Sequence, residues 1–187
     1  LFSGRPTLSE TQMAENTTTV PGTPHVEECQ DSVTRPAGNT TQYAAGDAIS
    51  DNATTATAAG AFTLDFRSRM GGGMTLLDFT LHKSDHDVTT ATFWLLLFDA
   101  LPAVAGWEDN GQLAITDAEM KNCKGSVTFA AADWQNVVLG DIQTVSKTIG
   151  IVLAATSTTL YGILVAGDTY TPGDAEVFTL TVKALVE

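Results

Sequence analysis

Two short runs, FTLDFR (residues 62–67) and LDFTLH (residues 77–82), decide the fold class of this chain. In each run a large apolar residue alternates with a polar one, which is the period of a β-strand that buries one face. Three consecutive glycines at residues 71–73 separate the runs and are typical of a tight connection. We therefore expect the two runs to form an antiparallel pair, with Leu77, Phe79 and Leu81 on the buried face of the second.

The strand pattern continues toward the C terminus. Residues 92–98 form a continuous apolar run, as expected for a central strand covered on both faces. Further strands are expected around residues 127–129, 134–139, 145–153, 161–165 and 178–182, separated by turn signals such as Asn110-Gly111 and Pro172-Gly173. Thr116 and Glu119 have the spacing of a capping box and predict one short helix. About eight strands and one helical turn predict an all-β fold, an antiparallel β-sandwich of the jelly-roll type.

The composition fits one domain with an arm, and it narrows the classes of partner. The 187 residues carry 22 acidic and 9 basic side chains, for a net charge of −13. Nucleic acid is not expected as a partner, because phosphate binding needs clustered Lys and Arg. An acidic surface fits docking onto a basic protein surface, although solubility alone also explains it. No apolar run has the length of a membrane-spanning helix, so no membrane partner is expected.

Residues 1–32 differ from the rest and are expected to form an extended N-terminal arm, with the β-sandwich domain at residues 33–187. Large apolar residues are nearly absent from this segment, so it cannot bury enough surface to offset the entropy lost on ordering. A partner outside its own domain would then hold it; the alternative is that it lies on its own sandwich. Residues 1–6 show neither the basic nor the apolar region of a signal peptide.

Candidate chemical sites are few, and a simpler explanation accounts for each. His82, Asp85, His86 and Asp87 could ligate a metal, but polar loop residues explain the run without one and are the favoured interpretation. The aspartate-rich turns near residues 109–111 and 168–174 lack the spacing of a calcium loop. Cys29 and Cys123 have no CxxC spacing and are expected as free thiols. No G-x-S-x-G elbow is present. We expect no enzyme activity, no catalytic residue, no metal and no cofactor.

Trp107 and Tyr170 raise a second functional possibility. Both lie in expected loops, where an aromatic ring can stack on a sugar or anchor a partner. A carbohydrate-binding or tail-associated β-module is therefore an alternative function. For Trp107, covering the core is the competing explanation.

The segment VTRPAGNTTQYAAGDAIS, residues 33–50, resembles one found in small virion proteins of tailed bacteriophages. The shared pattern is approximately V-T-R-P, then Y-A-x-G-D and an aliphatic residue, matched here by residues 33–36, 43–44, 46–47 and 49. A second match is the apolar strand followed by Asp99-Ala100-Leu101-Pro102. Asp109-Asn110 and residues 116–119 follow in similar form. The resemblance covers residues 33–120; the arm has no counterpart in it.

The resemblance implies a capsid decoration (cement) protein or another minor head protein, with a β-sandwich fold. Such a protein would act on the capsid exterior as a homotrimer, bridging subunits of the major capsid protein, after assembly in the host bacterial cytoplasm. Within the segment, a turn is expected at Pro36 and Gly38, an aromatic anchor at Tyr43, and a second turn at Gly46. The residues expected to bind partners are Arg35, Pro36, Tyr43 and Trp107.

Overall fold

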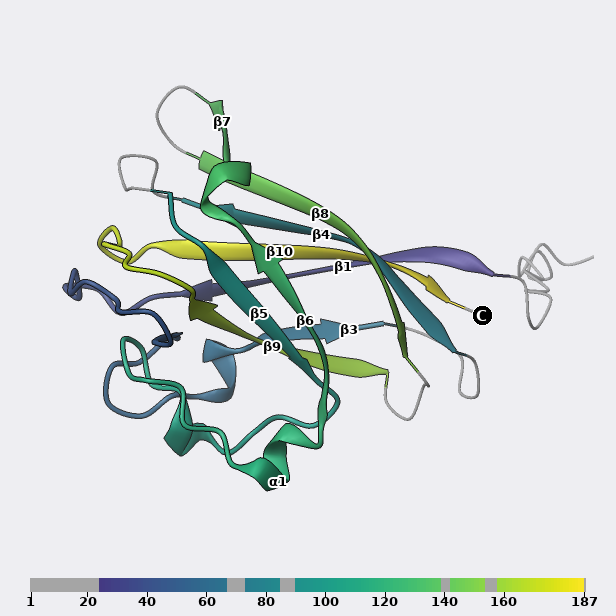
Figure 1. Cartoon of the computed structure of the whole chain (residues 1–187), viewed down its shortest axis with the longest axis horizontal. Coiled ribbons are helices and arrows are strands. Elements are labelled where there is room, and N and C mark those ends of the chain that lie inside the picture. Colours follow the sequence, from purple (N-terminus) through teal and green to yellow (C-terminus); the bar gives the residue numbers. More distant parts are fainter. Residues whose placement is uncertain (1–23, 67–72, 85–89, 139–141, 154–157, 187) are drawn as a thin grey trace, which may run out of the picture.

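The computed structural model describes residues 24–66, 73–84, 90–138, 142–153 and 158–186 and folds them into two antiparallel sheets packed face to face (Figure 1). The first sheet has the order β1 (His25–Thr34), β10 (Val177–Val186), β4 (Met74–Lys83), β8 (Ile142–Leu153) and β7 (Gln135–Val138). The second has the order β2 (Ala48–Ile49), β9 (Thr159–Ala166), β5 (Phe93–Phe98) and β6 (Cys123–Phe129), and β3 (Phe62–Asp65) also pairs with β9.

The strands cross repeatedly between the two sheets along the chain. β1 lies in the first sheet, β2 and β3 in the second, β4 in the first, β5 and β6 in the second. β7 and β8 return to the first sheet, β9 to the second, and β10 closes the first between β1 and β4. This is the jelly-roll arrangement. The predicted all-β sandwich of the jelly-roll type, with a single short α-helix among the described residues, is confirmed.

The two runs that indicate the fold class do not pair with each other, so that prediction is wrong. β3 pairs with β9, whereas β4 lies between β10 and β8 in the opposite sheet. Their apolar faces meet across the core instead. A register shift in β4 between Leu76 and Asp78 also changes which side chains point inward. Leu76 is therefore buried with Phe79, and Leu77 is only partly buried.

β1 is a strand that the sequence did not indicate. It pairs with β10 over its whole length, from His25 opposite Val186 to Thr34 opposite Val177. Only Val33 of its ten residues is buried, so the alternation that reveals a strand is weak. The boundary expected after residue 32 falls inside β1. Residues 1–23, which make up most of the expected arm, lie outside the described residues.

The core has two parts, because the second sheet is covered on both faces. The larger part fills the space between the sheets and includes Phe79, Phe93 and Phe178. The smaller part lies on the outer face of the second sheet, where Phe98 and Ile163 pack with Trp107. The segment that covers this face runs from β5 to β6 and contains α1 (Asp117–Met120) and a 3-10 turn, η3 (Val104–Gly106). Two further 3-10 turns are η2 (Ala58–Gly60) and η4 (Ala131–Asp133).

The covering segment depends on a close backbone approach at Gly106. The amide of Ala114 donates to the carbonyl of Gly106 at 2.7 Å, and a Cβ on Gly106 would lie 2.5 Å from the carbonyl oxygen of Ala114. We expect Gly106→Ala to lower the free energy of unfolding by about 1–3 kcal/mol, because the backbone must shift to make room. Urea unfolding followed by circular dichroism measures this.

The matched control for Gly106→Ala is Gly150→Ala on β8. A Cβ there meets nothing within 4 Å, so we expect this change to be neutral or stabilising by up to ~1 kcal/mol. Equal losses of stability in both variants would contradict the role of the close approach.

The predicted capping box at α1 is present. The Thr116 side chain accepts from the amide of Glu119, and the Glu119 carboxylate accepts from the amide of Thr116 at 2.9 Å. The same carboxylate accepts from the amide of Ala103 at 2.6 Å, which fastens the start of the covering segment to its helix. These hydrogen bonds, led by that from the Thr116 hydroxyl, lower the pKa of Glu119.

A lowered pKa in the folded state has a defined consequence for stability. The charged form of Glu119 is favoured by folding, so its contribution is present above the ordinary glutamate pKa of 4.5 and is lost as the pH falls through the lower folded value. We expect Glu119→Gln to be less stable than the wild type at neutral pH. The difference should disappear in acid, measured by thermal unfolding across pH; a pH-independent difference would contradict this origin.

Candidate functional site

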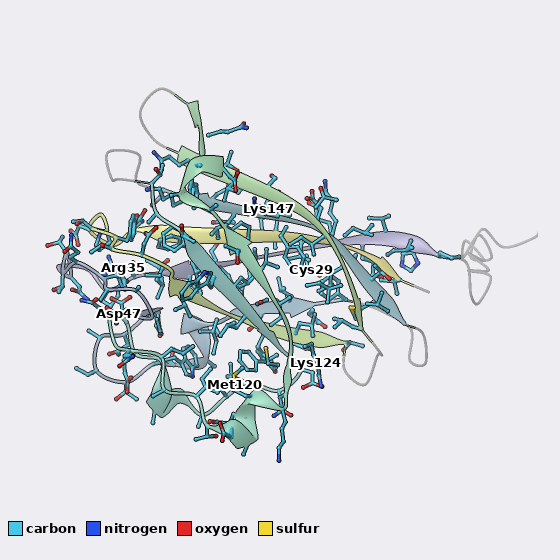
Figure 2. All side chains as sticks on the ribbon, in the orientation of Figure 1. Cys29, Arg35, Asp47, Met120, Lys124 and Lys147 are labelled. Carbon is cyan, nitrogen blue, oxygen red and sulfur yellow. The ribbon has the colours of Figure 1, made fainter. Side chains whose placement is uncertain are left out.

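The segment at residues 33–50 is fastened to the sandwich by an ion pair that is fully buried. The Arg35 guanidinium lies 3.0 Å from the Asp109 carboxylate, and both side chains have no exposed surface. Arg35 follows directly after β1, and its amide donates to the carbonyl of Glu176, just before β10, at 3.0 Å. Asp109 comes from the covering segment between β5 and β6. Arg35 lies at the left end of the sandwich in Figure 2.

Asp109 collects hydrogen bonds from several parts of the chain. Its carboxylate accepts from the hydroxyl of Tyr43, the side-chain amide of Asn39 at 2.8 Å and the backbone amide of Ser50 at 3.2 Å. Nη2 of Arg35 donates to Asp109, and its other terminal nitrogen, Nη1, donates to the carbonyl of Gly173 at 3.1 Å. We call Arg35, Asn39, Tyr43, Ser50 and Asp109 the polar lock. Every donor in it that points at Asp109 comes from residues 35–50, so the lock closes this segment onto one carboxylate.

Tyr43 joins the polar lock to a second buried group. Its ring stacks on Tyr170 with centroids 6.1 Å apart, and the two backbones form an antiparallel bridge. The Tyr170 hydroxyl donates to the Glu176 carboxylate at 2.6 Å, and the amino group of Lys83 lies 5.0 Å from the centre of the Tyr170 ring. Lys83 and Glu176 are both buried. Two charged clusters therefore share one aromatic stack at this end of the molecule.

Burial and charge hold the lock in one protonation state. Burial, reinforced by the nearby Asp109 carboxylate, raises the pKa of Tyr43 well above its ordinary value, so the phenol stays neutral and can donate. Burial alone would lower the pKa of Arg35, but the ion pair with Asp109 and the hydrogen bond to the Tyr43 hydroxyl oxygen outweigh this effect and raise that pKa. The guanidinium thus stays charged, and a cation–π contact of 4.8 Å to the Tyr43 ring adds to its fit.

The local sequence explains how the segment reaches these partners. A turn at residues 37–38 follows Pro36, and a second turn includes Gly46, whose φ of +97° suits glycine. The Asp47 carboxylate accepts from the amide of Ala44 at 2.6 Å and closes this second turn. Ala48 then enters β2 beside Val165 of β9. The two predicted turns and the aromatic anchor at Tyr43 are therefore in place.

Three of the four residues expected to bind a partner are inside the protein. Arg35 is 1% exposed, and Tyr43 and Trp107 have no exposed surface. Their expected contact with a partner is not supported, because each already uses its polar group internally. The indole of Trp107 donates to the carbonyl of Ala103 at 3.0 Å. Pro36 is partly exposed, and its role in partner binding stays a prediction.

The stacking platforms expected for a sugar are also absent from the surface. Trp107 covers the outer face of the second sheet, which is the competing explanation that the sequence left open. Tyr170 has no exposed surface and packs edge-on against Phe93. The carbohydrate-binding alternative therefore loses both of its residues.

Little in the described residues points to metal or membrane chemistry. His82 lies on β4, where burial lowers its pKa, whereas Asp85, His86 and Asp87 are outside the described residues. Within the described ranges, no group of three or more His, Cys, Asp or Glu side chains is placed to hold a metal ion. Likewise, no helix of that part of the chain is long and apolar enough to cross a bilayer. Cys29 on β1 donates to the carbonyl of Asp65, and Cys123 begins β6 in the opposite sheet.

Comparison with known proteins gives distant structural likenesses. No protein-family model matches the sequence, and no curated protein matches it. A chain of the cyanophage Pam1 capsid asymmetric unit aligns with 96% of this chain and 100% of its own length, at 14% identity and a TM-score of 0.38. A chain of the Israel acute paralysis virus pentamer aligns over 86% of this chain and 88% of its own, at 12% identity and 0.36.

A further likeness is to desmodium yellow mottle tymovirus, at 11% identity and a TM-score of 0.27, over 98% of this chain and 95% of that one. With TM-scores this low, none of these likenesses carries an argument about what the chain does.

The polar lock makes a direct prediction about stability. Arg35→Met keeps much of the side-chain volume but leaves the buried Asp109 without its cation. We expect the free energy of unfolding to fall by about 3–5 kcal/mol, the usual result of removing one partner of a buried ion pair. Chemical denaturation with a full baseline at both ends measures this.

Lys124→Met is the matched control for Arg35→Met. Lys124 lies 2.8 Å from Asp99, and its side chain is 35% exposed. Solvent screens such a pair, so we expect its loss to cost no more than ~1 kcal/mol. Similar losses in the two variants would show that Arg35 is not what fastens the segment.

Proposed function

We propose that this chain is a structural protein of a tailed-bacteriophage virion that decorates the capsid exterior and stabilises it by bridging major capsid protein subunits. One observation carries the proposal. The sequence features that resemble phage virion proteins include Arg35, Tyr43 and Asp109, and these three meet in the polar lock. The matching residues are thus in contact with one another in the folded protein, although they are far apart in the sequence.

The character of the polar lock supports a non-enzymatic role. Its charges are paired with one another and closed to solvent, so no group there is held ready for a substrate. Catalytic groups are normally held in a cleft with access to a reactant. A lock of this kind serves rigidity, which suits a protein that must keep its shape against a loaded shell.

The physical properties of the chain fit a clamp on a repeating lattice. A rigid sandwich loses little entropy on docking, and many copies on one shell add their binding free energies. The net charge of −13 favours a basic docking surface and disfavours nucleic acid. As part of the proposal, residues 1–23 belong to an extended arm that reaches a neighbouring subunit, and the clamp is a homotrimer assembled in the host bacterial cytoplasm.

A binding experiment with capsids tests the proposal. Empty capsids produced without this chain are mixed with the purified protein and sedimented, and the bound copies are counted by quantitative gel analysis. We expect saturable binding at a fixed number of copies for each major capsid subunit. Decorated, DNA-filled particles should release their DNA at a higher temperature than bare ones, because a ligand that binds only the intact shell stabilises it.

Heat-unfolded protein and an unrelated acidic protein of similar size are the controls for this experiment. Binding that never saturates, or that both controls reproduce, would reject the decoration role. Removal of residues 1–23 separates the arm from the sandwich: undiminished affinity of the truncated protein would reject the arm as a contact while leaving decoration intact.

A further inference from the structure

The outer face of the second sheet is covered over only part of its area. The continuous apolar run of β5 places Phe93, Leu95 and Leu97 in the core between the sheets. The alternate residues Trp94, Leu96 and Phe98 point to the outer face. The covering segment buries Phe98 completely, but Leu96 is only partly buried and Trp94 is 39% exposed. β5 therefore has apolar residues on both of its faces. Its inner face is buried in the core, whereas its outer face is only partly covered by the rest of this chain.

The open part of this face is a shallow groove of about 450 Å³. Its floor is formed by neighbouring strands, with Trp94 opposite Val165 of β9 on one side and Thr128 of β6 on the other. Leu113 from the covering segment forms one wall. We call it the Trp94 groove; it is lined by Gly46, Trp94, Leu96, Gln112, Leu113, Ser126, Thr128 and Val165.

The Trp94 groove is uncharged in a strongly acidic protein. None of its eight lining residues is charged, although the chain carries 22 acidic side chains and a net charge of −13. Two copies of such a chain repel each other across most of their surfaces. They can approach closely only where acidic groups are missing, and apolar area there supplies the attraction. A basic partner, in contrast, would gain most from the acidic surfaces elsewhere.

The edge of the sheet beside the groove is also open. Among the described strands, β6 pairs only with β5, so its other edge offers unpaired backbone groups next to Ser126 and Thr128. Proteins usually protect such edges with charge, and Lys124 is the one charged residue of β6, already paired with Asp99. A neutral edge beside an apolar groove suits contact with an equally neutral surface.

We propose that the Trp94 groove and the adjoining edge of β6 form the surface through which a second copy of this chain docks. This inference deepens the self-association included in the proposed function and rests on it. It assigns that association to the outer face of the second sheet, centred on Trp94, rather than to the first sheet.

Sedimentation velocity of the full chain over a wide range of concentrations tests the inference. The wild type should associate reversibly. Trp94→Glu places a carboxylate in the middle of the contact, where it would face an apolar surface and a like-charged partner. We expect this change to weaken association at least about tenfold, because like charges and unpaired charges at a contact are strongly unfavourable.

Val152→Glu is the matched control. Val152 is also an exposed apolar residue, 78% exposed, but it lies on β8 of the first sheet. Its replacement adds the same charge to the chain and should leave association unchanged. Thr128→Glu provides a second charge in the groove without loss of the indole, so the test stands if Trp94→Glu fails to fold. Circular dichroism identifies which variants are folded.

Several results would overturn the inference. These are a wild type that stays monomeric at all concentrations, association that survives both groove variants, or association lost equally in Val152→Glu. Capsid sedimentation of the same variants separates this inference from the proposed function. If the wild type is monomeric and Trp94→Glu loses capsid binding, the groove docks the capsid and not a second copy. If association is lost in the groove variants and the monomers still bind capsids, both proposals stand.

Discussion

The whole N-terminal part of the jelly roll depends on one buried carboxylate. Asp109 cannot stay inside the protein without compensating donors, since an unpaired buried charge is strongly destabilising. Its donors come from residues 35–50, so burial of Asp109 requires this segment to pack against the covering segment at the end of the sandwich. One electrostatic requirement thus connects β1, β2 and the loop between β5 and β6, which are far apart in sequence.

The two sheets also differ in how far their outer faces are covered. The outer face of the second sheet is covered by the segment that carries Asp109, whereas the first sheet leaves Val26 and Val152 exposed to solvent. Within this segment Asp109, which belongs to the polar lock, and Trp107, which packs in the outer apolar cluster, lie close together in sequence, so charge and apolar packing hold the same part of the loop.

Much of the fold could be predicted from the sequence, because alternation is a local signal. The strands after residue 61 follow from their apolar periodicity, and the capping box of α1 follows from Thr116 and Glu119 alone. Pairing partners could not be predicted, since period two says which face is buried and not which sheet a strand joins. The bulge at Leu76 was hidden for the same reason: its neighbour Leu77 is equally apolar.

The residues expected to bind a partner include Arg35, Tyr43 and Trp107, and the structure buries all three. Arg35 and Tyr43 carry groups that are common at interfaces, and no local pattern indicates that an aspartate 74 residues after Arg35 will bury them. The one available signal was that Asp109, like Arg35 and Tyr43, belongs to the sequence pattern that resembles phage virion proteins. Trp94, in contrast, looked like core because it lies within an apolar run, and only the extent of the covering segment leaves it exposed.

The pairing of β1 with β10 also sets how the molecule can bear a mechanical load. His25 and Val186 lie opposite each other at one end of this ladder, and the polar lock lies at the other. A force that pulls His25 away from Val186 would separate β1 from β10 by breaking the hydrogen bonds of the ladder one at a time, so little force would be needed for each step. Separation of the two strands would stop at Arg35, where the hydrogen bonds to Asp109 and Gly173 must break together. The polar lock thus prevents partial separation of β1 from β10 from spreading to unfolding of the whole sandwich.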